Sequence, residues 1–257
     1  MHPHLELFWQ GQQAGSTRAN HLSGSISIEE GERIQLAVLE RWRTHGHELG
    51  GWKVGLTSGQ SRDSFGAGIR PFGNVLKHRI FTSGAHIPAA NVPNLGLETE
   101  VCFRIGSRLE GKRVTAQQAR AAVAAVLPAF ELNQKRTDAG ADSGVRVADN
   151  LSQWGIVIGP EIAMANAPEL GSIVVTQQLD GILQETVHAA GHIDDHFESL
   201  ASLTRELAKF DLALEAGMHV ITGAFTRSSN AGPGTYVGRF SGLGKVAELH
   251  VVKHSGA

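Results

Sequence analysis

Cysteine is almost absent from this sequence of 257 residues, with Cys102 as its single instance. One cysteine excludes an intramolecular disulfide and a cysteine-based zinc cluster, and it is typical of a protein that stays in a reducing cytoplasm. An excess of charge is absent too, since 23 basic and 25 acidic residues leave a formal net charge of −2. The totals indicate neither a nucleic-acid footprint nor a polybasic membrane patch, so we expect neither nucleic acid nor a membrane as a partner.

Long apolar stretches are also lacking. No run is long enough to span a bilayer, and the N-terminal residues show no basic segment followed by an apolar one, so we expect no secretory signal. The composition is otherwise that of a globular protein, with 41% hydrophobic residues that suffice for a sizeable core. No linker clearly divides the chain, so we expect a single domain over residues 1–257, mainly helical over 1–50 and β-rich over 51–257.

Capping-box motifs mark the starts of two predicted helices. Ser27 is followed by Glu30 at the required spacing, and apolar residues then predict an amphipathic helix that runs to about His45. Thr115–Gln118 has the same pattern and opens an alanine-rich helix. We expect Pro128 to end this second helix, because proline removes a backbone donor and clashes with the preceding turn.

The first helical unit is followed by a polar region, and one further helix is predicted late in the chain. Gly50-Gly51 is expected to end the first helical unit, and a polar, glycine-bearing region then runs over residues 57–88. Late in the chain, apolar residues at helical spacing between Phe197 and Leu214 predict a long amphipathic helix. Gly217 is expected to stop that helix.

Strand patterns dominate the second half of the sequence. Residues 173–186 predict a hairpin that turns at Asp180-Gly181, a favoured two-residue turn. Alternating or continuous apolar runs predict the other strands over residues 97–105, 129–133, 155–159, 219–222, 235–240 and 246–252. Because helices gather early and strands late, we expect an α+β fold rather than a doubly wound one.

Three glutamates are the candidates for a metal site. Glu98 and Glu100 are two residues apart on a predicted strand, so their side chains leave the same face about 7 Å apart. A solvated strand face is the ordinary interpretation of such a pair. Glu131, however, lies in an apolar run that indicates burial, and a buried carboxylate must be neutralised, paired or metal-bound. Three oxygen ligands without cysteine favour a hard cation, Mg²⁺ or Mn²⁺.

Lys53 is the candidate for proton transfer. It stands between Trp52 and Val54, with a glycine on either side of that trio. A lysine drawn into such a setting is able to act as a general acid or base. A lysine that extends from a strand to solvent explains the pattern equally well.

Histidines and glycines offer weaker candidates. Residues 192–196 hold two histidines and two aspartates, which makes them a rival metal site. This stretch lies where a turn enters a predicted helix, so Asp194 or Asp195 is more simply interpreted as the N-cap. The late glycines form no phosphate-binding pattern and are assigned to turns between strands: Gly223, Gly232, Gly234, Gly242 and Gly244.

Taken together, the motifs resemble the 2-keto-4-pentenoate hydratase and 4-oxalocrotonate decarboxylase family, within the fumarylacetoacetate hydrolase-like superfamily. The resemblance extends in order from about Gly51 to Val252. It rests on Gly51–Thr57, on Glu98-Thr99-Glu100, on Leu127–Glu131 with Arg136 five residues on, on Ala148–Ser152, and on Ala216-Gly217 followed by Ile221–Gly223. It implies a mixed, rolled β-sheet core with peripheral helices, like the C-terminal domain of fumarylacetoacetate hydrolase, assembled as a homo-oligomer.

The resemblance also implies a metal centre and a reaction class. Glu98, Glu100 and Glu131 would be the ligands of Mg²⁺ or Mn²⁺, and Lys53 would be the catalytic residue that transfers a proton. The implied substrate is a small 2-oxo acid, and a metal that binds its carboxylate and 2-oxo oxygen stabilises the enolate that develops there. The family serves mostly in the degradation of aromatic compounds.

Substrate contacts follow from the same resemblance. Ser152 and the backbone of Leu97 would lie near the substrate carboxylate, and Arg136 is a further substrate-binding candidate. A distal carboxylate on the substrate has four cationic candidates as partners, each with surface ion pairing as its ordinary role: Arg70, Lys77, Arg79 and Arg136.

Two departures from the family pattern leave the reaction open. Family hydratases usually carry an aspartate just before an aromatic-Gly pair, but residues 68–73 contain no acid. The usual Asp-Ser before the arginine is replaced by Gln134-Lys135. We expect a lyase that acts as a hydratase on a 2-hydroxydienoate, with decarboxylation of a 2-oxo-enedioate as an alternative that the missing aspartate favours. Acylpyruvate-type C–C hydrolysis and a non-catalytic, metabolite-binding role are the remaining alternatives.

Overall fold

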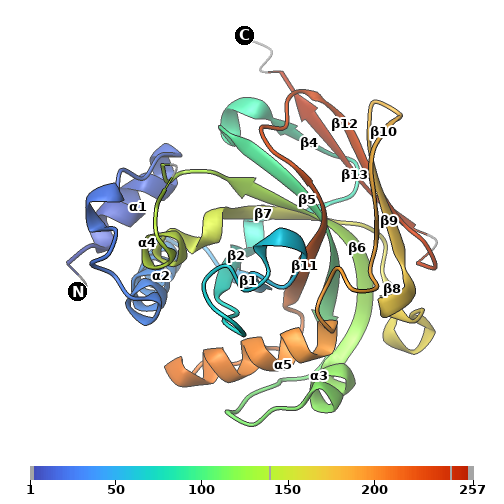
Figure 1. Ribbon diagram of the computed structural model, residues 1–257, viewed down its shortest axis with the longest axis horizontal. Coiled ribbons are helices and arrows are strands. Elements are labelled where there is room, and N and C mark those ends of the chain that lie inside the picture. Colours follow the sequence, from blue (N-terminus) through green and yellow to red (C-terminus); the bar gives the residue numbers. More distant parts are fainter. Residues whose placement is uncertain (1–2, 139, 244, 254–257) are drawn as a thin grey trace.

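The computed structural model describes residues 3–138, 140–243 and 245–253, and in this part of the chain helices lie along two sides of a pair of β-sheets (Figure 1). The helices α1, α2 and α4 gather on one side of the sheets, and α3 packs beside α5. None of the described helices is both long and apolar enough to cross a membrane. The α-helices are α1 (Leu5–Ala14), α2 (Ile28–Thr44), α3 (Ala116–Ala122), α4 (Ser143–Ala148) and α5 (His196–Leu207).

The larger sheet has the strand order β2-β1-β11-β5-β6-β7-β3, with β8 paired to β6, and the smaller sheet has the order β10-β9-β12-β13-β4. Both sheets mix parallel and antiparallel pairs. The strands are β1 (Leu49–Val54), β2 (Phe72–Leu76), β3 (Ile80–Thr82), β4 (Ala85–Pro88), β5 (Leu95–Ile105), β6 (Val123–Gln134), β7 (Gln153–Ile158), β8 (Ile162–Ala163), β9 (Val174–Leu179), β10 (Ile182–His188), β11 (His219–Ser228), β12 (Gly234–Phe240) and β13 (Lys245–Val252).

Buried apolar side chains hold the two sheets together. Leu97 and Leu132, which are partners across β5 and β6, lie in one cluster with Tyr236 of β12 and Leu249 of β13. Side chains on a strand alternate between its two faces, so the residues next to Leu97 and Leu132 point away from this cluster. The packing of the smaller sheet therefore leaves the opposite face of β5 and β6 for Glu98, Glu100 and Glu131.

The α+β class expected from the sequence is confirmed. The Ser27 hydroxyl accepts a hydrogen bond from the Glu30 amide at the start of α2, and Thr115 begins α3 with a complete capping box. The predicted hairpin is present as β9 and β10, and both turn residues, Asp180 and Gly181, have positive φ as a twisted two-residue turn requires.

The role expected for Pro128 is wrong. Helix α3 already ends at Ala122, and Pro128 lies inside β6 opposite Val101 of β5. On its other side β6 pairs with β8 at Val126 and with β7 from Ala129 onward. Pro128 thus occupies a step between two partner strands, where a missing backbone donor is tolerated. Burial of the alanine-rich segment in the sheet overrides its helix propensity.

Three other boundaries also differ from the prediction. Gly50-Gly51 lies inside β1 rather than at the end of a unit, and the region over 57–88 contains β2, β3 and β4. Helix α5 ends at Leu207, so Gly217 does not stop it, and Leu214 instead bridges to Leu109. Strands therefore occur early as well as late, because β1 and β2 join the large sheet through long-range pairing that local periodicity does not reveal.

Substitution of Gly51 tests the close pairing of β1 with β11. A Cβ atom at Gly51 would overlap the backbone carbonyl oxygen of His219, its partner on β11. We expect Gly51→Ala to lower the free energy of unfolding by about 1–3 kcal/mol in a chemical denaturation experiment. Gly232→Ala, where a Cβ meets nothing within 4 Å, is the matched control and should be nearly neutral. Equal stability of the two variants would contradict this packing.

Candidate active site

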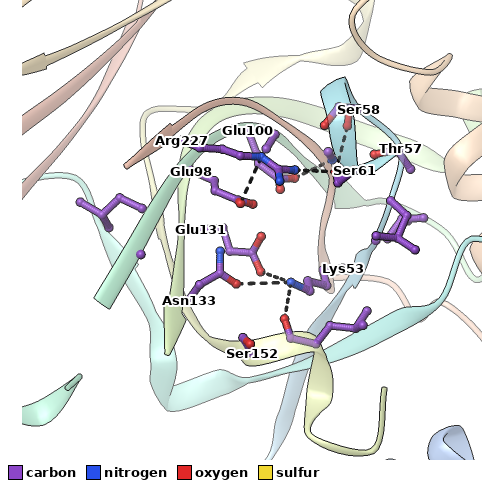
Figure 2. Close-up of a pocket in the computed structure, with 18 of the residues that line it drawn as sticks. Lys53, Thr57, Ser58, Ser61, Glu98, Glu100, Glu131, Asn133, Ser152 and Arg227 are labelled. Carbon is purple, nitrogen blue, oxygen red and sulfur yellow. Dashed lines mark hydrogen bonds and ion pairs between the residues drawn. The ribbon is translucent and has the colours of Figure 1, made fainter. Parts of the chain in front are cut away.

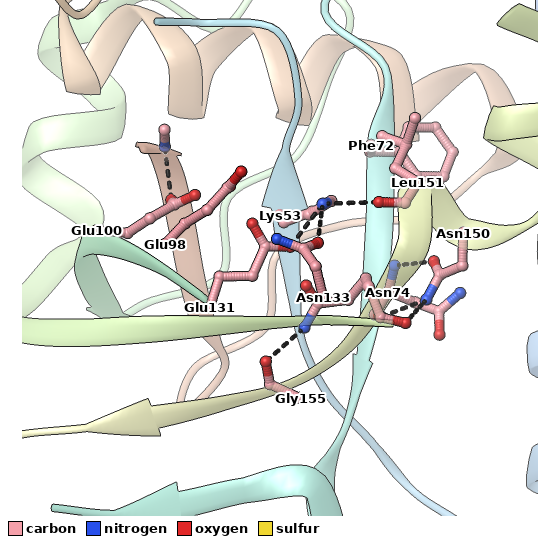
Figure 3. A network of polar contacts seen from close by, with 12 residues as sticks. Lys53, Phe72, Asn74, Glu98, Glu100, Glu131, Asn133, Asn150, Leu151 and Gly155 are labelled. Carbon is pink, nitrogen blue, oxygen red and sulfur yellow. Dashed lines mark hydrogen bonds and ion pairs between the residues drawn. The ribbon is translucent and has the colours of Figure 1, made fainter. Parts of the chain in front are cut away.

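The carboxylates of Glu98, Glu100 and Glu131 converge on one face of the larger sheet, where one oxygen from each lies within 4.8 Å of the others (Figure 3). Glu98 and Glu131 are direct partners across the antiparallel pair of β5 and β6, so their side chains start about 5 Å apart. Glu100 is two residues further along the same face of β5. Strand register alone therefore brings together three residues that are up to 33 positions apart.

Repulsion among these carboxylates is strong because water is largely excluded from them. Burial and the neighbouring Glu131 carboxylate raise the pKa of Glu98 to about 7. Burial, Glu131 and Glu98 together raise the pKa of Glu100 well above its ordinary value. The Gly223 amide donates to Glu100 at 2.6 Å, and the Arg227 guanidinium lies 3.4 Å from Glu98. Three carboxylate oxygens that repel one another in this way form a ligand set that fits a hard divalent cation.

Lys53 reaches the same site from β1. Its ammonium group donates to Glu131 at 2.5 Å, to the Leu151 carbonyl at 3.0 Å and to the Asn133 side chain at 3.4 Å (Figure 3). The side chain is 8% exposed, so the alternative of a lysine that extends to solvent is excluded. In a flat sheet β1 and β6 would be about 14 Å apart, since β11 and β5 lie between them. The contact therefore requires the rolled sheet that the resemblance implied.

The loop that follows α4 carries Ser152 and the Leu151 carbonyl into the site. Asn150, Leu151 and Ser152 all have positive φ, a run of left-handed conformations that is costly for non-glycine residues. The Asn150 side chain holds this run in place, because it accepts from the Asn74 amide at 2.7 Å and donates to the Asn74 carbonyl at 3.0 Å. The loop is thus tied to β2, the neighbour of the strand that carries Lys53.

Arg136 serves this loop instead of contacting the pocket. Its side chain is 1% exposed and pairs with Asp149 at 3.1 Å, and it also donates to the backbone carbonyls of Asp149 and Gln153. The expected direct contact of Arg136 with substrate is therefore wrong, since its donors are already used by the segment that surrounds Ser152. Arg136 thus stabilises the loop by hydrogen bonds on the side that faces away from the pocket lining.

A pocket of about 260 Å³ opens over the glutamates and is lined by Lys53, Leu97 and Ser152 as expected (Figure 2). Its size suits a small organic molecule. The remaining cationic candidates for a distal carboxylate do not line it. Arg70 pairs with Asp63 and Asp194, Lys77 pairs with Glu48, and Arg79 lies over the rings of Trp42 and Trp154.

The rival metal site is resolved in favour of helix capping. The Asp195 side chain accepts from the Glu198 amide at the start of α5, while Asp194 pairs with Arg62 and Arg70.

The assignment of late glycines to turns is wrong for Gly223, which lies in a bulge of β11 with φ +140°. A Cβ there would overlap the Thr57 side chain, so glycine allows its amide to approach Glu100. Gly244 lies outside the described residues.

Sequence reasoning missed several residues of the pocket. Asn133, Lys135, Arg146 and Arg227 line it together with serines from two loops. Arg227 is the register partner of Glu98 across β11 and β5, and Asn133 is two residues beyond Glu131 on the same face. The predicted strand at 219–222 was too short to include Arg227. A strand predicted over the full range of β11, His219–Ser228, would have included this residue.

Known proteins resemble this chain over most of its length. No family model matches the chain. The 4-oxalocrotonate decarboxylase of a Pseudomonas species is 30% identical over 218 residues, which cover 83% of this chain and 82% of the relative. This chain belongs to the 2-keto-4-pentenoate hydratase and 4-oxalocrotonate decarboxylase family. The motif-based recognition and the assignment to a family of lyases are thereby confirmed.

Two further relatives extend the comparison. The 2-oxo-hept-4-ene-1,7-dioate hydratase of Escherichia coli is 27% identical over 230 residues, which cover 86% of each chain. The solved structure of 4-oxalocrotonate decarboxylase from Pseudomonas putida G7, in complex with magnesium and adipate, covers 96% of this chain and 97% of its own. It superposes with a TM-score of 0.88 at 20% identity, which shows a shared fold.

The stability of the metal-free protein should depend on pH through Glu98. Its pKa in the folded protein, about 7, lies above the ordinary value of 4.5, so the folded state binds more protons between these values and loses stability as pH rises through them. Glu98→Gln removes this loss. In EDTA we expect the Tm of the variant to rise relative to wild type between pH 5 and pH 8, by the equivalent of ~2 kcal/mol.

Glu48→Gln is the control for this measurement, because Glu48 is exposed and pairs with Lys77 far from the pocket. Its Tm difference from wild type should stay nearly constant over the same pH range. A Tm of Glu98→Gln that falls relative to wild type as pH rises would contradict the raised pKa.

Proposed function

We propose that this protein is a divalent-metal-dependent lyase that acts on a small 2-oxo acid or its 2-hydroxydienoate tautomer, as a hydratase. The observation that carries the proposal is the contact of Lys53 with Glu131, beside two further carboxylates in a pocket that fits a small acid. A proton-transfer group next to a hard-cation site is what enolate chemistry requires. Membership of a family of hydratases and decarboxylases supports the same reaction class.

Glu98, Glu100 and Glu131 would hold the metal, which we propose to be Mg²⁺ or Mn²⁺. The relative from Pseudomonas putida G7, whose structure contains magnesium, supports a divalent cation as the cofactor. When bound, the cation would supply Lewis acidity at the 2-oxo group of the substrate. Residues 1–257 would act as one catalytic domain, with the metal site in the part beyond residue 50.

The protein's own residues position the substrate and move its proton. Ser152 and the backbone of Leu97 line the pocket and would lie beside the substrate carboxylate. Lys53 would deliver a proton to the conjugated carbon chain as the ammonium, or remove one from it as the neutral amine. Glu131 and the Leu151 carbonyl hold that group in a fixed direction, which reduces the cost of reaching a reactive geometry.

Decarboxylation is the second candidate, and the composition of the pocket favours it. Among the described residues that line the pocket, the three glutamates are the only acidic side chains. No further carboxylate is therefore present to activate a water molecule for addition, as the missing aspartate before Phe72 already indicated. Loss of a remote carboxyl group as CO₂ from a 2-oxo-3-enedioate moves the electron pair of the broken bond into the conjugated 2-oxo group, which yields the dienolate, and this step needs no such carboxylate.

A non-catalytic role finds no support in the geometry. It would be favoured by carboxylates that splay apart or by a lysine that points to solvent, and neither feature is present.

We further propose that the protein is a cytoplasmic homo-oligomer. Two exposed apolar residues beside the β9–β10 turn, Ile182 and Leu183, support the proposal of a homo-oligomer. The buried free thiol of Cys102 is in keeping with a cytoplasmic location.

An ultraviolet assay in Mg²⁺ tests the proposed function. The enzyme is offered 2-hydroxypenta-2,4-dienoate and 2-oxo-3-hexenedioate in parallel, and CO₂ release is measured. Metal-dependent loss of dienoate absorbance without CO₂ establishes a hydratase, whereas CO₂ release from the diacid alone establishes a decarboxylase. Absence of metal-dependent turnover with either acid, and with longer 2-oxo-enoic acids, would contradict the proposal.

Replacement of Lys53 tests its role in proton transfer. We expect Lys53→Met to lower kcat on the active substrate by a factor of about 10²–10⁴, because a positioned general acid or base contributes that much. Binding of Mn²⁺, followed by its electron paramagnetic resonance signal, should persist because the three glutamates remain. Lys77→Met removes an exposed lysine outside the pocket and should keep full activity. Full activity of Lys53→Met would exclude the assigned role.

A further inference from the structure

The pocket is lined by more positive charge than the metal site explains. Besides Lys53, its lining includes a cationic set that comes from three separate elements and consists of Lys135, Arg146 and Arg227. All three side chains are exposed to solvent, which places them where a substrate enters. With a divalent cation among the three glutamates, the charged side chains of the described lining would carry a net charge of about +3. A monocarboxylate balances one of these charges, and a dicarboxylate balances two.

Two members of the cationic set already have partners. Arg227 lies 3.4 Å from the Glu98 carboxylate and donates to the Ser61 hydroxyl at 2.8 Å (Figure 2). The Lys135 ammonium group lies 3.5 Å from the Ser229 hydroxyl, which it can reach as a donor. These contacts hold both side chains against neighbouring protein groups and leave fewer of their donors for a ligand.

Arg146 differs from both. Within the described residues its guanidinium makes no hydrogen bond and no ion pair, and it lies over the ring of Phe65 at 4.8 Å from the centroid. Stacking on an aromatic face fixes the plane of a guanidinium while its N–H donors at the edge stay available. Partial desolvation and the positive charge of Arg227 lower the pKa of Arg146, so the two arginines lie close enough to repel each other. An anion between them would relieve this repulsion.

We propose that Arg146 is a specificity-determining residue, which binds the distal carboxylate of a dicarboxylic 2-oxo acid. A guanidinium edge matches a carboxylate with two parallel hydrogen bonds, and the charge of Arg227 in the same pocket lining adds electrostatic attraction. The inference rests on the proposed function, because it requires the 2-oxo end of the same molecule to lie at the glutamates. None of the cations considered from the sequence takes this role, since the structure commits each of them elsewhere.

The test compares two unreactive acids of equal chain length, 2-oxoadipate and 2-oxohexanoate, which differ only in the distal carboxylate. Binding is measured by isothermal titration calorimetry in Mg²⁺ with the full-length protein. We expect wild type to bind 2-oxoadipate at least tenfold more tightly than 2-oxohexanoate. Arg146→Met should weaken binding of 2-oxoadipate about tenfold more than binding of 2-oxohexanoate, and Arg146→Lys should retain part of the preference because it keeps the charge.

Arg43→Met is the matched control, since Arg43 is exposed on α2, pairs with Glu40 and does not line the pocket. It should keep the wild-type preference for the diacid. Equal affinities of wild type for the two acids, or an unchanged preference in Arg146→Met, would overturn the inference. Absence of binding by both acids would also overturn it. The ultraviolet assay then separates the two proposals, because metal-dependent turnover of any of its acids leaves the proposed function standing, and silence with all of them overturns both.

Discussion

The burial of three carboxylates within 4.8 Å of one another is the constraint on which the site depends. Like charges this close cannot all ionise without compensating positive charge, and among the described residues two cationic side chains, Lys53 and Arg227, contact the carboxylates. Lys53 compensates Glu131, the Gly223 amide compensates Glu100, and Arg227 approaches Glu98 from 3.4 Å. The rolled sheet serves this arrangement, because only its curvature brings β1 close enough to β6 for the lysine to take part.

The site also requires polar groups of the loop over 150–152 to face Lys53 and the pocket, and the backbone of this loop is strained as a result. Three consecutive left-handed residues are unfavourable, yet they direct the Leu151 carbonyl at Lys53 and place Ser152 in the pocket. Arg136 donates to the backbone carbonyls of Asp149 and Gln153, which flank the loop, and the Asn150 side chain ties the loop to the backbone of β2 at Asn74. These residues never touch the pocket, but they determine where its polar groups point. Such support explains why an arginine of the family motif is buried.

Local patterns predicted most of what depends on neighbouring residues. Caps, the hairpin turn and the long strand β5 follow from spacing within a few positions, and Glu131 was recognised because a carboxylate interrupts a buried run. What failed depends on distant pairing. Pro128 is tolerated in β6 because β7 and β8 pair on either side of it, and Arg227 reaches Glu98 because β11 is longer than its apolar core. Neither fact is encoded by periodicity.

The most direct test of the account is the position of a bound metal. Crystals grown with Mn²⁺ give anomalous scattering that locates the ion independently of the protein atoms. The account predicts a strong peak between Glu98, Glu100 and Glu131, about 2.0–2.3 Å from one oxygen of each, with the Lys53 ammonium group outside its coordination shell. A peak at the aspartates and histidines of residues 192–196 instead, or no peak at the glutamates at saturating Mn²⁺, would contradict it.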